Sequence, residues 1–120
     1  MPGSDLSERL LDFAAQVVRL FPPLAKTGAG RHISAQLTRS ATSAGANYEE
    51  ACGAESRADF IHKMQIVLKE LRESHYWLRL IERCGIAKAI SEPLAVALAE
   101  ADELRKIIGK SIVTARKNSR

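Results

Sequence analysis

Residues 56–85 read SRADFIHKMQIVLKELRESHYWLRLIERCG, and their apolar positions recur at the spacing of one long α-helix. Ser56 with Asp59 three residues later is typical of a helix N-terminus, and Gly85 is typical of a helix stop. At 100° per residue, one face of this helix carries the expected core positions, which are Phe60, Met64, Val67, Leu71, Ser74, Leu78 and Ile81. The stretch therefore predicts a helix that ends at Cys84 and buries one face in a bundle.

A second group of apolar side chains lies beside this predicted core face, at Ile66, Trp77 and Leu80. The apolar surface of the helix is thus wider than a surface helix in a monomeric bundle needs. Either neighbouring helices or another subunit must cover it. We predict that Ile66, Trp77 and Leu80 contribute to a homo-oligomer interface.

The remaining face of the helix is a cationic stripe, formed by Lys69, Arg72, Tyr76, Arg79 and Arg83. Four cations with a tyrosine between them can contact phosphates and stack a base. The alternative is a solvated face on which the tyrosine only covers apolar surface. The stripe makes nucleic acid, RNA or DNA, a candidate partner.

Basic residues also dominate the end of the chain. After Glu103 the sequence contains no acidic residue, and its last basic residues are Arg116, Lys117 and Arg120. This pattern suits a helix C-terminus or a contact with a polyanion. We treat these three residues as further candidates for nucleic-acid binding.

Proline and glycine divide the rest of the chain into further helices. The first is predicted from about Asp5 to about Leu20, with Ser4 as its N-cap. Pro22 and Pro23 should bend or end it.

The loop over residues 26–30 should then reverse the chain. The second helix is predicted from about His32 to Cys52, and Gly53 should stop it. Within it, the glycine at position 45 lies in a run of small residues, which suggests that packing needs space there. The last helix should begin near Ser91, with Pro93 in its first turn.

Short loops between long helices imply antiparallel neighbours. The predicted fold class is therefore all-α, an up-and-down antiparallel four-helix bundle. It forms a single domain over residues 1–120, with a basic C-terminal tail at about residues 114–120. Its 120 residues, 46% of them hydrophobic and 27% charged, have the balance of one folded domain.

The sequence predicts a cytoplasmic protein without a membrane partner. Its N-terminus has no signal-peptide pattern, and no apolar segment can span a bilayer. Two cysteines, Cys52 and Cys84, are too few for a disulfide framework and fit a reducing compartment. The bundle places them at opposite ends, so we expect both to be free and to pack at helix ends.

No pattern of residues indicates an enzyme, a metal or a cofactor. A di-metal site in a helical bundle needs paired Glu-x-x-His motifs, and only Asp59 with His62 comes close. Asp59 is better explained as part of a helix cap. The chain has no glycine-rich phosphate loop, and neither cysteine has a base evident from the sequence. Catalysis would have to come from a partner.

The block QLTRSATSAGANYEEA at residues 36–51, followed by Ser56, Phe60 and LKELRES at residues 68–74, resembles the bacterial family of ribosomal-RNA intervening-sequence proteins. The shared pattern is an arginine, small residues, then Asn47 and Glu50, with an acidic residue at Glu73. The chain departs from the family at Ala51, where glycine is common, and at residues 69–70, where Gly-Ser is common.

This resemblance implies an all-α bundle that assembles into a ring, commonly a pentamer. A related branch contains the accessory protein of diversity-generating retroelements, which binds reverse transcriptase and RNA through a basic surface. The resemblance thus adds a polymerase-type protein to the candidate partners.

The matched residues also have a structural interpretation. In an antiparallel pair of helices that turns near residue 54, Arg39 lies near Glu70 and within a turn of Glu73, and Asn47 faces the start of the next helix. We predict that Arg39, Asn47, Glu50, Glu70 and Glu73 form a polar network that fixes helix register rather than a ligand site.

Two functions remain open. The first is a non-enzymatic, oligomeric helical bundle associated with RNA or a ribonucleoprotein, as an accessory or scaffold protein. The alternative is a purely structural protein–protein assembly module that binds no nucleic acid. Salt-dependent binding of RNA separates them.

Overall fold

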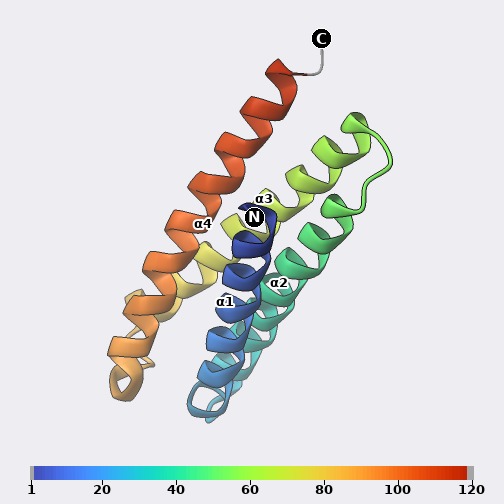
Figure 1. Ribbon diagram of the computed structural model, residues 1–120. Coiled ribbons are helices and arrows are strands. Elements are labelled where there is room, and N and C mark those ends of the chain that lie inside the picture. Colours follow the sequence, from blue (N-terminus) through green and yellow to red (C-terminus); the bar gives the residue numbers. More distant parts are fainter. Residues whose placement is uncertain (1, 119–120) are drawn as a thin grey trace.

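The structure, a computed structural model, describes the backbone of residues 2–118 and the side chains of residues 5–118. Over this range it contains four α-helices and one short 3-10 helix, in the order α1 (Pro2–Leu24), α2 (Gly28–Cys52), α3 (Arg57–Cys84), η1 (Lys88–Ile90) and α4 (Ser91–Lys117). The α-helices run alternately up and down around a common core (Figure 1). The predicted all-α four-helix bundle is confirmed.

Both ends of α3 follow from local chemistry. The Ser56 hydroxyl accepts a hydrogen bond from the backbone N–H of Asp59 at 3.0 Å and caps the helix. Gly85, with φ of 68°, ends the helix in the left-handed conformation that favours glycine. The N-terminus of α4 at Ser91 also agrees with the prediction.

The predicted ends of α1 are wrong. The helix begins at Pro2, so Ser4 lies inside it and is not its N-cap, and it continues through Pro22 and Pro23 to Leu24. A proline removes one N–H donor, but its fixed φ remains compatible with helix. Helical hydrogen bonding resumes directly afterwards, because the N–H of Ala25 donates to the carbonyl of Phe21 at 2.9 Å.

The second helix also begins earlier than predicted, at Gly28 rather than near His32. The hydroxyl of Thr27 accepts a hydrogen bond from the N–H of Gly30 at 3.0 Å and so caps the helix. The predicted loop over residues 26–30 is therefore shorter, and both of its glycines belong to the first turn of α2.

Gly30 allows the ends of α1 and α2 to meet. A Cβ atom added at this position would lie 1.9 Å from the carbonyl oxygen of Leu24, which is far inside contact distance. Gly45 differs, because a Cβ atom there would lie 3.8 Å from Leu10, an ordinary contact. Packing within the chain therefore does not require a glycine at position 45, contrary to the expectation from the sequence.

The core consists of side chains at spacings of three and four along each helix. On α1 these are Leu10, Phe13, Val17, Leu20 and Leu24. The predicted core face of α3 is buried, except for Phe60, which is only partly covered. Between α2 and α3 the hydroxyl oxygens of Ser40 and Ser74, both fully buried, lie 2.8 Å apart. Small side chains bring these two helices close together.

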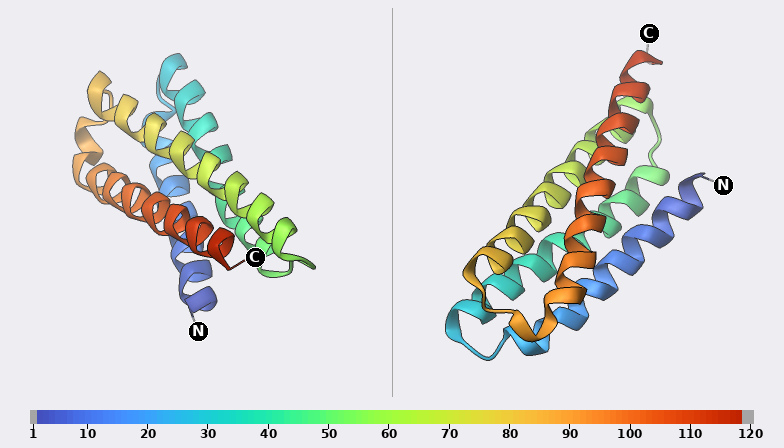
Figure 2. Two further views of the ribbon diagram at one scale, coloured as in Figure 1. Left: turned by 90° about the horizontal axis from the view of Figure 1, so that it is seen from above. Right: turned by 90° about the vertical axis from the view of Figure 1, so that its left-hand side faces the viewer.

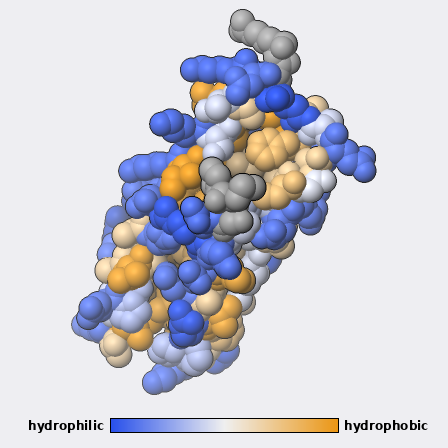
Figure 3. All heavy atoms as spheres, in the orientation of Figure 1, coloured by the Kyte–Doolittle hydropathy of each residue, from blue (hydrophilic) through white to orange (hydrophobic). Residues whose placement is uncertain are grey.

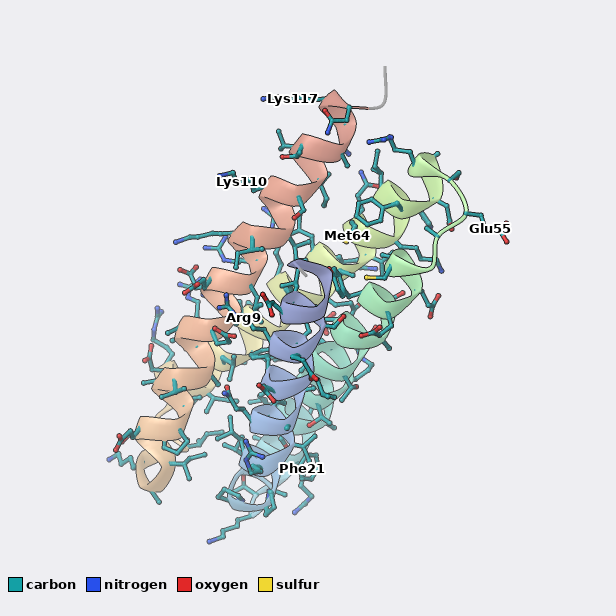
Figure 4. The ribbon with its side chains drawn as sticks, viewed as in Figure 1. Arg9, Phe21, Glu55, Met64, Lys110 and Lys117 are labelled. Atoms are coloured by element: carbon teal, nitrogen blue, oxygen red, sulfur yellow. The ribbon has the colours of Figure 1, made fainter. Side chains whose placement is uncertain are left out.

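The molecule measures 50 × 21 × 19 Å, and its ring of helices is least tightly closed between α1 and α4. Figure 2 shows the N-terminal end of α1 and the C-terminal end of α4 pointing apart. Arg9 bridges these helices by ion pairs to Glu100 at 2.7 Å and Glu103 at 3.2 Å. The guanidinium lies between α1 and α4 in Figure 4. Among the described residues, no helix is both long and apolar enough to cross a bilayer.

Candidate nucleic-acid-binding face

The cationic stripe lies on the outside of α3. Its residues, Lys69, Arg72, Tyr76, Arg79 and Arg83, are all exposed. At 1.5 Å of rise per residue the stripe extends over about 21 Å. Within the described part of the chain, none of its four cations pairs with an acidic side chain. Their charge is available to an external anion.

Tyr76 occupies the middle of the stripe and is 56% exposed. Its ring meets that of Trp77 edge to face, with centroids 5.2 Å apart and an interplanar angle of 73°. The contact holds the tyrosine in place and leaves more than half of its surface open, as stacking on a base would require.

The fold adds two residues to this face that the sequence analysis missed. His75 of α3 and Arg105 of α4 join Arg72, Tyr76 and Arg79 around an open hollow of about 270 Å³. The antiparallel pairing of α3 with α4 brings Arg105 to this position. The register between α3 and α4 was the one signal that would have identified Arg105 as part of this face.

Electrostatics within this hollow are dominated by cations. Burial lowers the pKa of His75, and the nearby Arg105 lowers it further, against an opposing effect of Asp102. Hydrogen bonds from Lys106 and Arg105 lower the pKa of Asp102. The single carboxylate is therefore already engaged by two cations of its own helix.

The basic C-terminal residues lie apart from the stripe. Residues 114–117, predicted as a tail, form the last turn of α4, where Arg116 and Lys117 are exposed. Lys117 extends outward from the bundle in Figure 4. This turn lies beside the start of α3, since Ala115 and Phe60 line one hollow there. Arg120 lies outside the described residues.

Arg39, Glu70 and Glu73 come together as predicted. Nη1 of Arg39 lies 3.2 Å from Oε2 of Glu70, and Nη2 bonds to Oε2 of Glu73. Trp77 donates from Nε1 to the same Glu73 oxygen at 3.0 Å. The Glu70 side chain is only 9% exposed, so the cluster joins α2 to α3 near the core.

The other two members of the predicted network lie elsewhere. The amide of Asn47 donates to the carbonyl of Ser43 at 2.9 Å, within α2. Glu50 pairs with Lys63 at 2.7 Å and thereby raises the pKa of Lys63. The predicted register thus brings Arg39 to Glu70 and Glu73, but Asn47 and Glu50 make their contacts outside that cluster.

We expect Arg39→Ala to lower the free energy of unfolding by about 1–3 kcal/mol, because the buried carboxylate of Glu70 loses its partner. Thermal and urea unfolding would measure the change. Lys63→Ala is the matched control, since it breaks the more exposed pair with Glu50 and should change stability little. Equal effects of the two variants would contradict a structural role for the Arg39 cluster.

The proposed interface residues Ile66, Trp77 and Leu80 are all half-buried within the single chain. Trp77 and Leu80 pack against its own core, and the Trp77 ring meets that of His32 with centroids 6.1 Å apart. Neighbouring helices therefore cover much of this surface.

The most exposed large apolar side chain lies instead on α1. Leu11 is 63% exposed, and Val18 follows two turns later at 48%. Leu11 borders a groove of about 830 Å³ between α1 and α2, with Gly45 on the opposite wall. Figure 3 shows apolar patches among the hydrophilic side chains on the face that includes α1. From the sequence alone, Leu11 and Val18 could not be distinguished from the apolar residues on the core face of α1.

Cys52 and Cys84 are free and lie at the ends of α2 and α3, as predicted, but both are exposed rather than packed. In the region that the structure describes, no three His, Cys, Asp or Glu side chains are grouped to hold a metal ion.

The fold and this surface define a small all-α four-helix-bundle protein with a cationic face on one helix that has no acidic partner among the described residues. The chain belongs to the 23S rRNA-intervening sequence protein family, whose sequence pattern matches residues 5–110. No curated protein matches it. It is similar to a crystal structure from Bacteroides thetaiotaomicron, described as a protein with unknown function from the S23 ribosomal protein family, with 36% identity and a TM-score of 0.81. The alignment covers 93% of this chain and 98% of that chain.

Proposed function

We propose that this chain is a non-enzymatic, oligomeric accessory or scaffold protein that binds RNA through the cationic stripe of α3. The observation that carries the proposal is the absence of acidic partners for Lys69, Arg72, Arg79 and Arg83 within the described part of the chain. In contrast, Glu70 and Glu73 of α3 both pair with Arg39 of α2. The unpaired cations can contact phosphates along a strand, and Tyr76 offers a stacking surface.

Self-association is the second part of the proposal. The exposed Leu11 and Val18 and the groove beside them favour burial against another copy of the chain, in addition to the half-buried Trp77 and Leu80. A ring, commonly a pentamer in the family that the chain resembles, would repeat the cationic stripe several times around one particle. Repetition raises the affinity for a long polyanion without any new contact.

A polymerase-type protein is the proposed protein partner, and it would supply any catalysis. The cytoplasm is the proposed location, because both exposed cysteines are free. The alternative remains an assembly module without nucleic acid. It is supported by the Arg39 cluster, in which charged residues of α3 join two helices of the bundle.

Fluorescence anisotropy with a structured RNA tests the proposal. Binding should be measurable at about 50 mM salt and should weaken linearly in log affinity against log salt concentration. The double variant Arg72→Glu/Arg79→Glu should reduce affinity by about 100-fold or more, since two phosphate contacts become repulsive.

The matched control is Arg19→Glu/Arg57→Glu, which makes the same change in net charge at two other exposed arginines. It should retain most of the binding. Light scattering on the same samples should give about five times the 13.2 kDa chain mass for all three proteins. Absence of RNA binding at low salt would leave the structural assembly module as the function, and a monomeric mass would remove the ring.

A further inference from the structure

The hollow between α3 and α4 gathers more positive charge than any other described hollow of the surface. Arg72 and Arg79 approach from α3 and Arg105 from α4. Nε of Arg105 is covered and has no acceptor among the described residues. Arg105 bonds to Asp102 through Nη2 at 2.6 Å, which holds its guanidinium beside the hollow.

We propose that this hollow is a phosphodiester subsite for single-stranded nucleic acid, and that His75 within it makes binding stronger as the pH falls. The inference rests on the proposed function and specifies which part of the cationic face holds the phosphate. A hollow of about 270 Å³ has room for one phosphate group, and arginine forks suit its oxygens. Tyr76 at its rim can stack the adjacent base.

His75 provides the dependence on pH. In the free protein it is surrounded by Arg79 of its own helix and by Asp102, Arg105 and Lys106 of α4, and burial together with these cations lowers its pKa. A bound phosphate adds negative charge beside the ring and raises the pKa again. Since the pKa is higher in the complex than in the free protein, binding takes up a proton. The affinity must therefore rise as the pH falls through the range between the pKa of His75 in the complex and its pKa in the free protein.

Fluorescence anisotropy with labelled oligothymidylate tests this inference, because neither its bases nor its phosphodiesters titrate in the relevant range. Between about pH 7.5 and about pH 5.5 the affinity of the natural chain should rise several-fold, and by no more than about tenfold per pH unit for one proton. His75→Gln should abolish this rise and bind as the natural chain does at the higher pH. His62→Gln, at an exposed position of α3 outside the hollow, should keep it.

A second pair of variants tests the geometry without reference to pH. Arg105→Gln should weaken oligothymidylate binding by about tenfold, whereas Lys110→Gln on the outside of α4 should weaken it much less. Figure 4 shows Lys110 extending away from the other helices. Circular dichroism at each pH confirms that every variant is folded.

The outcomes separate the two proposals. If the chain binds no nucleic acid at any pH, the proposed function fails. If it binds but Arg105→Gln and Lys110→Gln behave alike, or if the affinity does not respond to pH, the inference about the hollow fails and the proposed function stands.

Discussion

Phe13→Ala should lower the free energy of unfolding by about 3–5 kcal/mol, a large part of the stability of a domain of this size. Phe13 is fully buried on the inward face of α1 and is among the largest of the buried side chains. Its removal loses the transfer free energy of the buried ring and leaves a cavity in the core. Urea unfolding followed by circular dichroism would measure the change.

Phe60→Ala is the matched control, because it removes the same side chain from a partly covered position. It should cost less, since part of this side chain already contacts solvent and a smaller cavity forms. If the two variants were equally stable, α1 would not be packed on the bundle as the structure describes.

Gly30→Ala should destabilise the fold by about 3 kcal/mol despite the better helix propensity of alanine. The added methyl carbon would lie 1.9 Å from the Leu24 carbonyl oxygen, so the ends of α1 and α2 must move apart. Backbone lies on both sides of the contact, and no side-chain rotation relieves it. Thermal unfolding would measure the loss.

The control for this substitution is Gly109→Ala in α4, where an added Cβ atom has no neighbour within 4 Å. It should stabilise the protein by up to about 1 kcal/mol, because alanine loses less backbone entropy in a helix. A stabilising effect at position 30 as well would show that the α1–α2 connection is looser than described.

Those parts of the fold that depend on local chemistry could be predicted. Ser56, Asp59 and Gly85 mark the ends of α3 through capping and a left-handed turn, which involve only neighbouring residues. The ends of α1 and the start of α2 could not, because proline and glycine have more than one use. The sequence suggested that Pro22 and Pro23 bend or end α1, but the helix contains both of them. Gly30 read as part of a loop, yet it serves a contact between two helices.

The candidate site likewise combines features that the sequence predicts with features that it does not. The stripe of α3 follows from helical periodicity alone, and all five of its residues are exposed. The pair of Arg39 with Glu70 follows from antiparallel pairing. Arg105 and the exact partner of Asn47 depend on the register between helices, which is set by buried contacts such as that of Ser40 with Ser74. Periodicity of a single helix carries no information about such contacts.

The limited packing between α1 and α4 has a consequence for how the chain folds. Because α1 packs chiefly on α2, α2 on α3 and α3 on α4, most helix contacts join segments that follow each other directly in the sequence. Only short loops must close before each hairpin of helices gains its buried surface, so the relative contact order is low. Chains of this kind fold within microseconds to milliseconds. The newly synthesised helices can thus dock in the order in which they are made, before the bridge from Arg9 to Glu100 joins the first helix to the last.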